Sequence, residues 1–118
     1  MSALTTATAT CITAKFSEKN FDACEAFREK VHFILSKKEL KKNLKSVGNA
    51  YYYVLFDSLS KGKKNKISFA AMRPTIKNAL KDKEIAARCN VDDAYKKYLK
   101  LLAISPSRCI KEWEKNNG

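Results

Sequence analysis

Hydrophobic residues along this chain recur at steps of three and four, which is the period of one face of an α-helix. The first such stretch follows Asn20, a residue type that often caps helices. Its apolar positions are Cys24, Phe27, Val31 and Ile34. The chain also has only three Gly and two Pro, too few for the many turns of an all-β sandwich or barrel. The pattern therefore predicts an all-α fold.

Two further helices are expected on either side of Gly48. Ser36 and Glu39 have the spacing of a capping box, in which a hydroxyl and a carboxylate satisfy each other's backbone amides, so a short helix should begin there. Gly48 readily adopts the left-handed conformation and is expected to end that helix, and Asn49 to cap the next. The apolar positions are Leu40, Leu44 and Val47 in the second helix and Tyr52, Leu55, Phe56 and Leu59 in the third.

The second half of the chain predicts two more helices and a short final one. The fourth contains Pro74, which must lie in its first turn or kink it. The fifth is expected over 92–103, capped near Asn90 or Asp92, and Ser107 is expected to cap the last helix. The apolar positions are Met72, Ile76, Ala79 and Leu80, then Ala94, Tyr95, Tyr98, Leu101 and Leu102, and finally Ile110 and Trp113.

The chain of 118 residues is long enough for one domain with one core. Residues 1–19, rich in Thr and Ala without a helical period, are expected to form an extended arm. Residues 20–104 are expected to form a compact domain of short helices, and residues 105–118 a short C-terminal helix or tail. The whole chain should contain five or six helices.

The segment between the third and fourth helices has the spacing of an EF-hand. A twelve-residue loop over 60–71 has Ile67 at its eighth position, where an EF-hand loop pairs in a short strand, and Asn65 at its sixth, where a left-handed residue is usual. The positions that would bind calcium hold Ser60, Gly62, Lys64, Ser68 and Ala71. Because none of these is a carboxylate, the spacing predicts either a degenerate EF-hand that cannot bind calcium or a plain helix–loop–helix.

The balance of charges adds a prediction about partners. The chain carries 24 Lys and Arg against 12 Asp and Glu, a formal net charge of +12 at pH 7. The excess is concentrated in residues 37–66, which hold nine Lys against Glu39 and Asp57. Such a surplus favours an acidic partner, whether a nucleic acid, an anionic membrane or a protein surface. The candidate partner-binding residues are Lys37, Lys38, Lys41, Lys42, Lys45, Lys61, Lys63, Lys64 and Lys66.

Residues suited to catalysis or metal binding are sparse and scattered. The four cysteines, Cys11, Cys24, Cys89 and Cys109, include no CxxC pair, so we expect no zinc site, no cofactor and reduced thiols in an intracellular protein. His32 is the only histidine and has no Ser or Cys partner at a catalytic spacing. We therefore expect no enzymatic activity. No apolar run approaches the roughly 20 residues that span a bilayer, so membrane insertion is not expected.

Residues 54–69, VLFDSLSKGKKNKISF, resemble the core motif of the tubulin polymerization-promoting protein family. The matching positions are Phe56, Gly62, Lys63, Ile67, Phe69 and Met72. Met72 stands where the family has Phe, and Gly62 lies one residue later relative to Phe56. The order of helices over about residues 21–103 is also similar. The resemblance implies binding to microtubules and a cytoplasmic, cytoskeletal location, which in several members is a cilium or flagellum.

The resemblance favours the degenerate EF-hand over the plain helix–loop–helix for residues 20–104. Charge and resemblance together predict a non-enzymatic, calcium-independent domain that docks on acidic tubulin through residues 37–45 and 61–66. The alternative is a nucleic-acid-binding protein, because a basic stripe is its electrostatic footprint and the tyrosines at 51–53 supply rings for stacking. Helical spacing argues against it by placing Tyr52 on the same face as Phe56, toward the core. A helical scaffold or structural protein of another kind is a third possibility.

Overall fold

The computed structural model of the protein describes residues 20–37 and 43–117. Within these ranges the chain forms six helices and no strand, which confirms the predicted all-α class. None of these helices is both long enough and apolar enough to cross a membrane. The arm expected over 1–19 lies outside the described residues, as do Lys38, Lys41 and Lys42.

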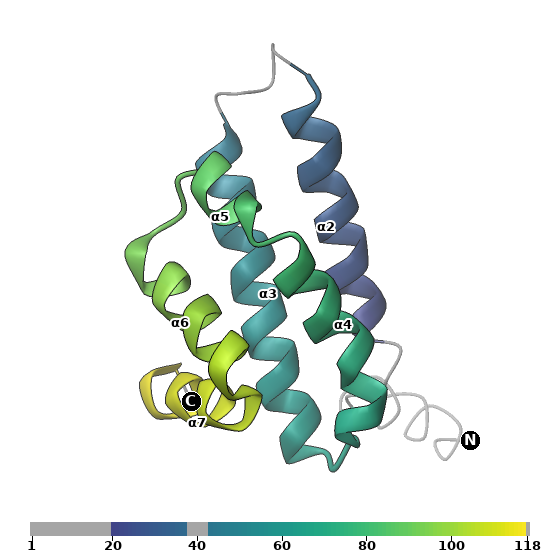
Figure 1. The fold of residues 1–118 in the computed structure, drawn as a ribbon. Helices are drawn as coiled ribbons and strands as arrows, with labels where there is room; N and C mark the ends of the chain where they lie inside the picture. The colour runs from purple at the N-terminus through teal and green to yellow at the C-terminus, as the bar shows by residue number, and fades with distance from the viewer. Residues whose placement is uncertain (1–19, 38–42, 118) are drawn as a thin grey trace, which may run out of the picture.

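The helices form a bundle in which the long helices before the last run alternately in opposite directions, and the last helix lies across one end (Figure 1). They are α2 (Phe21–Leu35), α3 (Leu44–Lys64), α4 (Phe69–Lys81), α5 (Glu84–Arg88), α6 (Asp93–Ile104) and α7 (Pro106–Asn117). The 21-residue α3 is central, because α2, α4, α5, α6 and α7 all pack against it. The last helix, α7, packs on both α6 and α3 and so closes one end of the bundle.

The centre of the core comes from α3. Tyr52, Leu55, Phe56 and Leu59 are at most 1% exposed, as the spacing of apolar positions predicts. Burying a large apolar side chain of this kind stabilises a fold by roughly 1.5–3 kcal/mol. The ring centroids of Phe56 and Trp113 lie 5.6 Å apart, so the tryptophan joins α7 to the core.

The expected end of a helix at Gly48 is wrong, because α3 continues through Gly48 and Asn49 without a break. Gly48 is buried against the side chains of Cys89 and Val91. Asn49 caps no helix, and its Oδ1 instead accepts a hydrogen bond from the backbone N–H of Asp92 at 3.0 Å. Both residues therefore serve the contact between α3 and the segment that joins α5 to α6.

The capping role predicted for Ser36 is also wrong. Ser36 is the C-cap of α2, and its hydroxyl donates to the carbonyl of Phe33 at 2.6 Å. Glu39, the other half of the predicted capping box, lies outside the described residues. The next described helix is α3, which begins at Leu44.

The twelve-residue loop predicted over 60–71 is wrong as well. Because α3 continues to Lys64 and α4 begins at Phe69, only residues 65–68 lie between the two helices. Ser68 is the N-cap of α4, and its hydroxyl accepts a hydrogen bond from the backbone N–H of Ala71 at 3.2 Å. The two helices therefore form a tight hairpin without the shape of a calcium loop, and an EF-hand origin stays a prediction.

The turn of this hairpin is a Schellman motif. The backbone N–H of Ile67 donates to the carbonyl of Gly62 at 2.9 Å, and that of Lys66 donates to Lys63 at 3.1 Å. The residue in the left-handed conformation is Lys66, with φ of 60°, and not the predicted Asn65. Asn65 instead donates its side-chain amide to the carbonyl of Lys61 at 2.8 Å. These bonds satisfy the carbonyls of Lys61, Gly62 and Lys63 in the last turn of α3.

The remaining helix ends differ from the prediction by small shifts. Pro74 lies inside α4, in its second turn. The short α5 is an addition to the predicted helices, and Asn90 ends it with φ of 51°, so Asp92 is the N-cap of α6. The last helix begins at Pro106, one residue after Ser105, so Ser107 lies within it and does not cap it.

Candidate docking surface

The predicted lysines that the structure describes do not form one surface. Lys45 lies near the start of α3 and Lys61 near its end, so the helical rise separates them by roughly 24 Å along the axis. Lys37 follows the end of α2, which lies at the same end of the bundle as the start of α3 (Figure 1). The lysines at the opposite end are Lys61, Lys63, Lys64 and Lys66.

At the first end, the two described lysines have partners within the protein. The Nζ of Lys45 lies 3.5 Å from Oδ1 of Asp92, in a pair with both side chains more than half exposed. Exposed pairs of this kind contribute about 0–1 kcal/mol. The Nζ of Lys37 lies 5.5 Å from the ring centroid of the exposed Phe33, within the range of a cation–π contact.

At the second end, most of the lysines are unpaired. Lys61 pairs with Asp57 at 3.0 Å, one helical turn earlier. Lys63, Lys64 and Lys66 are exposed and form no ion pair with any residue in the described ranges. Cations in the last turn of a helix gain about 0.3–1 kcal/mol from the helix dipole, which accounts for part of the lysine enrichment. It does not account for Lys66, which lies beyond the helix.

Gly62 fixes the position of these turn lysines. A Cβ added to Gly62 would stand 2.8 Å from the sulfur of Met72 and 2.9 Å from Cζ of Phe21. A side chain at this position would therefore displace the thioether of Met72 or the ring of Phe21, and glycine avoids this where the end of α3 meets α4 and α2. The turn is held by close packing on its inner side while its lysines project outward.

The outward face of α4 extends the basic character of the turn. Arg73, Lys77 and Lys81 follow one another at four-residue steps, so they lie on one face of the helix. The buried residues Met72, Thr75, Ile76 and Ala79 form the opposite face. The three cations form no ion pair within the described part of the chain, and together with Ala70, Pro74 and Asn78 they line a shallow groove of about 510 Å³. We call Lys63, Lys64, Lys66, Arg73, Lys77 and Lys81 the basic surface.

The three α4 cations are not among the predicted site residues, although a signal for them is present in the sequence. Their four-residue spacing is visible once a helix is assigned to 69–81. The charge density of residues 37–66 is higher, and it identifies only the turn half of the basic surface.

The acidic residues near the basic surface, Asp82 and Glu25, form hydrogen bonds that join α2 to the end of α4. Oδ2 of Asp82 lies 2.5 Å from Nη1 of Arg28 and 2.9 Å from Nε2 of His32. Oε1 of Glu25 accepts hydrogen bonds from Nδ2 of Asn78 at 2.6 Å and from Nη2 of Arg28 at 3.2 Å. Burial alone would raise the pKa of Asp82, but the hydrogen bonds from His32 and Arg28 outweigh it and hold the pKa below its usual range. These acids therefore have partners other than the lysines of the basic surface.

The thiols of the described cysteines are buried and unreactive. Cys24, Cys89 and Cys109 are free and at most 1% exposed. Burial raises the pKa of Cys24 to about 11 and that of Cys109 to about 12, and it also raises the pKa of Cys89. Because the thiolate is the reactive form, these groups are poor nucleophiles. Among the described residues, no group of three or more His, Cys, Asp and Glu side chains is placed to hold a metal ion.

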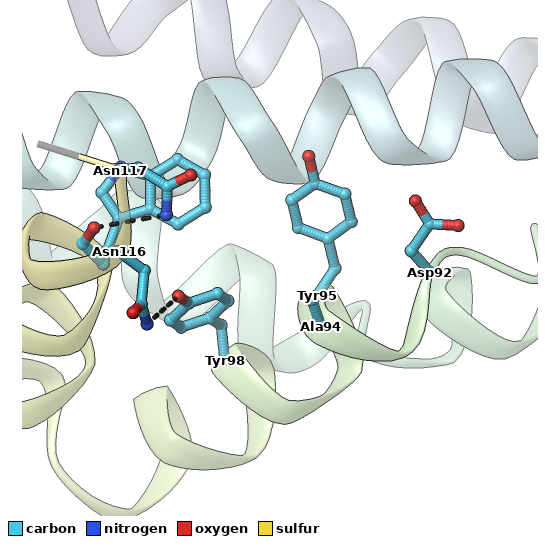
Figure 2. Close-up of a pocket in the computed structure, with 7 residues that line it drawn as sticks. Asp92, Ala94, Tyr95, Tyr98, Asn116 and Asn117 are labelled. Atoms are coloured by element: carbon cyan, nitrogen blue, oxygen red, sulfur yellow. Dashed lines mark hydrogen bonds between the residues drawn. The ribbon is translucent and has the colours of Figure 1, made fainter.

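A pocket of about 390 Å³ lies where α6 meets α7 (Figure 2). Its walls are Asp92, Ala94, Tyr95, Tyr98, Trp113, Asn116 and Asn117. Asn116 donates to the hydroxyl of Tyr98 at 2.8 Å, and Asn117 donates to the carbonyl of Trp113 at 3.3 Å. The ring centroid of Trp113 lies 5.3 Å from that of Tyr98 and 6.4 Å from that of Tyr95. The rings therefore pack on one another and do not surround a ligand, so this pocket belongs to the joint between two helices.

The tyrosines at 51–53 offer little surface for stacking nucleic acid bases. Tyr51 is 1% exposed and Tyr52 is fully buried, as its place on the Phe56 face predicts. Tyr53 is 49% exposed, but its ring packs edge-on against Trp113 with centroids 5.5 Å apart. These three tyrosines therefore do not provide the exposed aromatic rings on which proteins stack the bases of single-stranded nucleic acids.

No model of a known protein family matches this chain, and neither a curated protein nor a solved structure matches it. The resemblance to the tubulin polymerization-promoting protein family stays a prediction based on residues 54–69. What the protein does must therefore be inferred from the geometry and charge of its own side chains.

Proposed function

We propose that the protein is a non-enzymatic module that docks on an acidic protein surface through the basic surface. The observation that carries this proposal is the set of exposed cations on the α3–α4 turn and on α4, none of which pairs with an acid in the described ranges. Since α4 has 13 residues, the basic surface extends over about 20 Å. An array of this length suits a partner with many spaced carboxylates.

The chemistry of the basic surface favours an acidic protein over a nucleic acid. Five of its six cations are lysines, with Arg73 the single arginine. Lysine is a flexible point charge that tolerates loosely ordered carboxylates, whereas arginine is preferred for bidentate recognition of bases and phosphates. The burial of Tyr51 and Tyr52 points the same way, because it removes two rings that single strands would stack on.

Microtubules are the partner that we propose. The resemblance of residues 54–69 to the tubulin polymerization-promoting protein family implies them, and their acidic tubulin surface matches the charge of the basic surface. A polymer also presents a continuous surface, which suits a basic surface that extends over about 20 Å. A cytoskeletal location, including a cilium or flagellum, follows from the same proposal.

Co-sedimentation with taxol-stabilised microtubules tests the proposal. Wild type is expected to pellet at low salt and to be released as salt rises, because screening weakens exposed charge pairs. A variant with Lys64→Glu, Arg73→Glu and Lys77→Glu should lose most of this binding. The matched control is Lys97→Glu, Lys111→Glu and Lys115→Glu, which changes the net charge equally at exposed positions of α6 and α7.

Three outcomes would contradict the proposal. One is the absence of pelleting by wild type at low salt. Another is an equal loss of binding in the two triple variants, which would mean that binding depends on the net charge of the protein and not on the position of the cations. The third is tighter binding to duplex DNA or RNA with a steeper dependence on salt, which would assign the basic surface to a nucleic acid. Circular dichroism spectra of all variants should match wild type, because the substituted side chains are exposed.

A further inference from the structure

A second surface, made of residues outside the basic surface, is an apolar groove of about 580 Å³ between α5 and α6. Its apolar lining, which we call the groove floor, includes Ala86, Ala87, Leu99 and Ala103, and Ile104 lies at its edge. Ile104 is 76% exposed, the highest exposure among the large hydrophobic side chains in the described ranges. An aliphatic side chain exposed beside a groove of small apolar residues indicates a surface that a partner covers.

The shape of the groove suits a helix. On one side, α6 contributes residues 96, 99, 100, 103 and 104, which lie on one helical face and span about 12 Å along the axis. On the other side lie α5 and the end of α4, with alanines that leave room for a partner's larger side chains. A trough of this length accepts about two helical turns, with anchors spaced three, four and seven residues apart.

Both edges of the groove are basic. Lys83 lies on the α5 edge, and Lys96 and Lys100 lie on the α6 edge. Lys83 and Lys100 form no ion pair with a residue that the structure describes. Lys96 approaches Asp93 at 3.9 Å, but the Asp93 side chain is fully exposed, so this pair is weak. A partner helix with acids on both sides of its apolar stripe would complement this arrangement.

Charge argues against two other occupants of the groove. A second copy of the chain would bring a net charge of +12 toward three lysines, which repulsion disfavours. The chain's own segment 1–19 contains one acid, Glu18, between Lys15 and Lys19, so it does not complement the basic edges.

We propose that the groove between α5 and α6 binds an amphipathic helix of a partner protein, with apolar anchors on the groove floor and Asp or Glu facing Lys83, Lys96 and Lys100. The groove and the basic surface are separate sets of residues. This proposal therefore stands or falls independently of docking on microtubules.

Fluorescence anisotropy with a designed probe tests the proposal on the full chain. The probe is a labelled 16-residue helix-forming peptide with leucines at i, i+4 and i+7 and glutamates on both sides of them. We expect micromolar binding, and binding at least about tenfold weaker for a scrambled peptide of the same composition, because it cannot align its leucines on the groove floor. A version with lysine in place of glutamate should not bind.

Substitutions in the groove should weaken binding of the acidic probe. Ile104→Gln removes an exposed apolar contact, and Lys96→Glu with Lys100→Glu reverses one edge, so each change should lower the affinity about tenfold or more. Lys97→Glu is the matched control, because Lys97 lies on α6 but outside the groove, and it should change the affinity less than about twofold. Microtubule pelleting should be the same for Ile104→Gln as for wild type.

Four results would overturn this assignment. Equal binding of the ordered and scrambled peptides, or full binding by Ile104→Gln, would exclude the groove as the site. Displacement of the probe by a synthetic peptide of residues 1–19 would assign the groove to the chain itself. Sedimentation of wild type as a dimer that Ile104→Gln dissociates would assign it to a second copy.

Discussion

Gly48, in the second turn of α3, lies so close to Cys89 that a Cβ added to the glycine would stand 2.7 Å from the Cβ of the cysteine. Cγ1 of Val91 would be equally near, at 2.7 Å. A Cβ is fixed to the backbone and cannot move aside by rotation, so one of the two segments would have to shift. The glycine thus permits close contact between α3 and the segment after α5, although glycine inside a helix is unfavourable by itself.

We predict that Gly48→Ala destabilises the protein. In an open helix interior, alanine gains up to about 1 kcal/mol over glycine, but the overpacking here costs about 1–3 kcal/mol. The free energy of unfolding measured in urea should therefore fall by about 1–2 kcal/mol. Ser46→Ala, an exposed position in the same helix, is the control and should change stability by less than about 0.5 kcal/mol. A Gly48→Ala protein more stable than wild type would contradict the close contact.

Gly48 also shows why helix boundaries were harder to predict than helix faces. The buried faces of α2, α3 and α4 largely follow from the spacing of their apolar residues, because the period records which side of each helix is buried. In α6 the buried Leu99 is not among the predicted positions and the predicted Ala94 is exposed. Small residues are ambiguous in the sequence: Gly48, Ser60 and Gly62 have the composition of turns, yet all three are buried within α3. The two glycines lie where other segments pack closely on this helix. The neighbour that requires a small side chain lies far away in the sequence, so the local pattern cannot distinguish the two cases.

The candidate site, like the helices, was predictable only in part. The lysines of the α3–α4 turn follow from charge density alone. Their distance from Lys45 depends on α3 being one unbroken helix, and the sequence wrongly predicts that a helix ends at Gly48. Arg73, Lys77 and Lys81 join the turn lysines only once α4 is known to follow after a turn over 65–68. Composition locates charge along the chain, whereas the length of each helix decides which charges share a surface.

We predict that Tyr51→Phe leaves stability unchanged or raises it by about 1–2 kcal/mol. The Tyr51 hydroxyl is buried and finds no hydrogen-bond partner among the described residues, so its removal relieves a desolvation cost. Tyr98→Phe is the matched comparison, because it breaks the 2.8 Å hydrogen bond from Asn116 and should cost about 0.5–1.5 kcal/mol. Thermal and urea unfolding measure both. Equal destabilisation of the two variants would mean that the Tyr51 hydroxyl has a partner.

Asp82 predicts a loss of stability in acid. The pKa of Asp82 is lower in the folded protein than in the unfolded chain, where it is about 3.9. The stability that the charged carboxylate contributes is therefore fully present above the unfolded pKa, and it is lost as the pH falls through the folded pKa. We expect Asp82→Asn to be less stable than wild type by about 1–3 kcal/mol at pH 7, because Arg28 and His32 lose a charged partner. The difference should shrink below about pH 4.

Urea unfolding of both proteins between pH 7 and pH 3 measures this dependence. Glu112→Gln, at an exposed position of α7, is the control and should stay within about 0.5 kcal/mol of wild type at pH 7. A difference between Asp82→Asn and wild type that is constant with pH would show that the charge of Asp82 contributes nothing to stability.

The buried thiols predict protection from thiol reagents. In a Cys11→Ser variant, Cys24, Cys89 and Cys109 should react with Ellman's reagent at pH 8 only as the protein opens. With the pKa of Cys24 at about 11, its thiolate fraction at pH 8 is more than about a hundredfold below that of a free thiol. All three thiols should react quickly in denaturant. Adding Ser46→Cys supplies an exposed thiol as the positive control, and rapid native reaction without it would contradict the burial of the three cysteines.

The length of α3 gives a prediction that separates the two lysine groups in docking. Lys45 already pairs with Asp92 and lies roughly 24 Å along the helix from the turn, so Lys45→Glu should change the affinity for microtubules less than about twofold. Lys64→Glu with Lys66→Glu removes two unpaired cations of the basic surface and should lower the affinity about tenfold. Co-sedimentation at one fixed low salt concentration compares the variants directly. Lys45→Glu could instead weaken binding as much as the Lys64→Glu and Lys66→Glu variant does. In that case the partner spans both ends of the bundle, and the contact includes Lys45 as well as the basic surface.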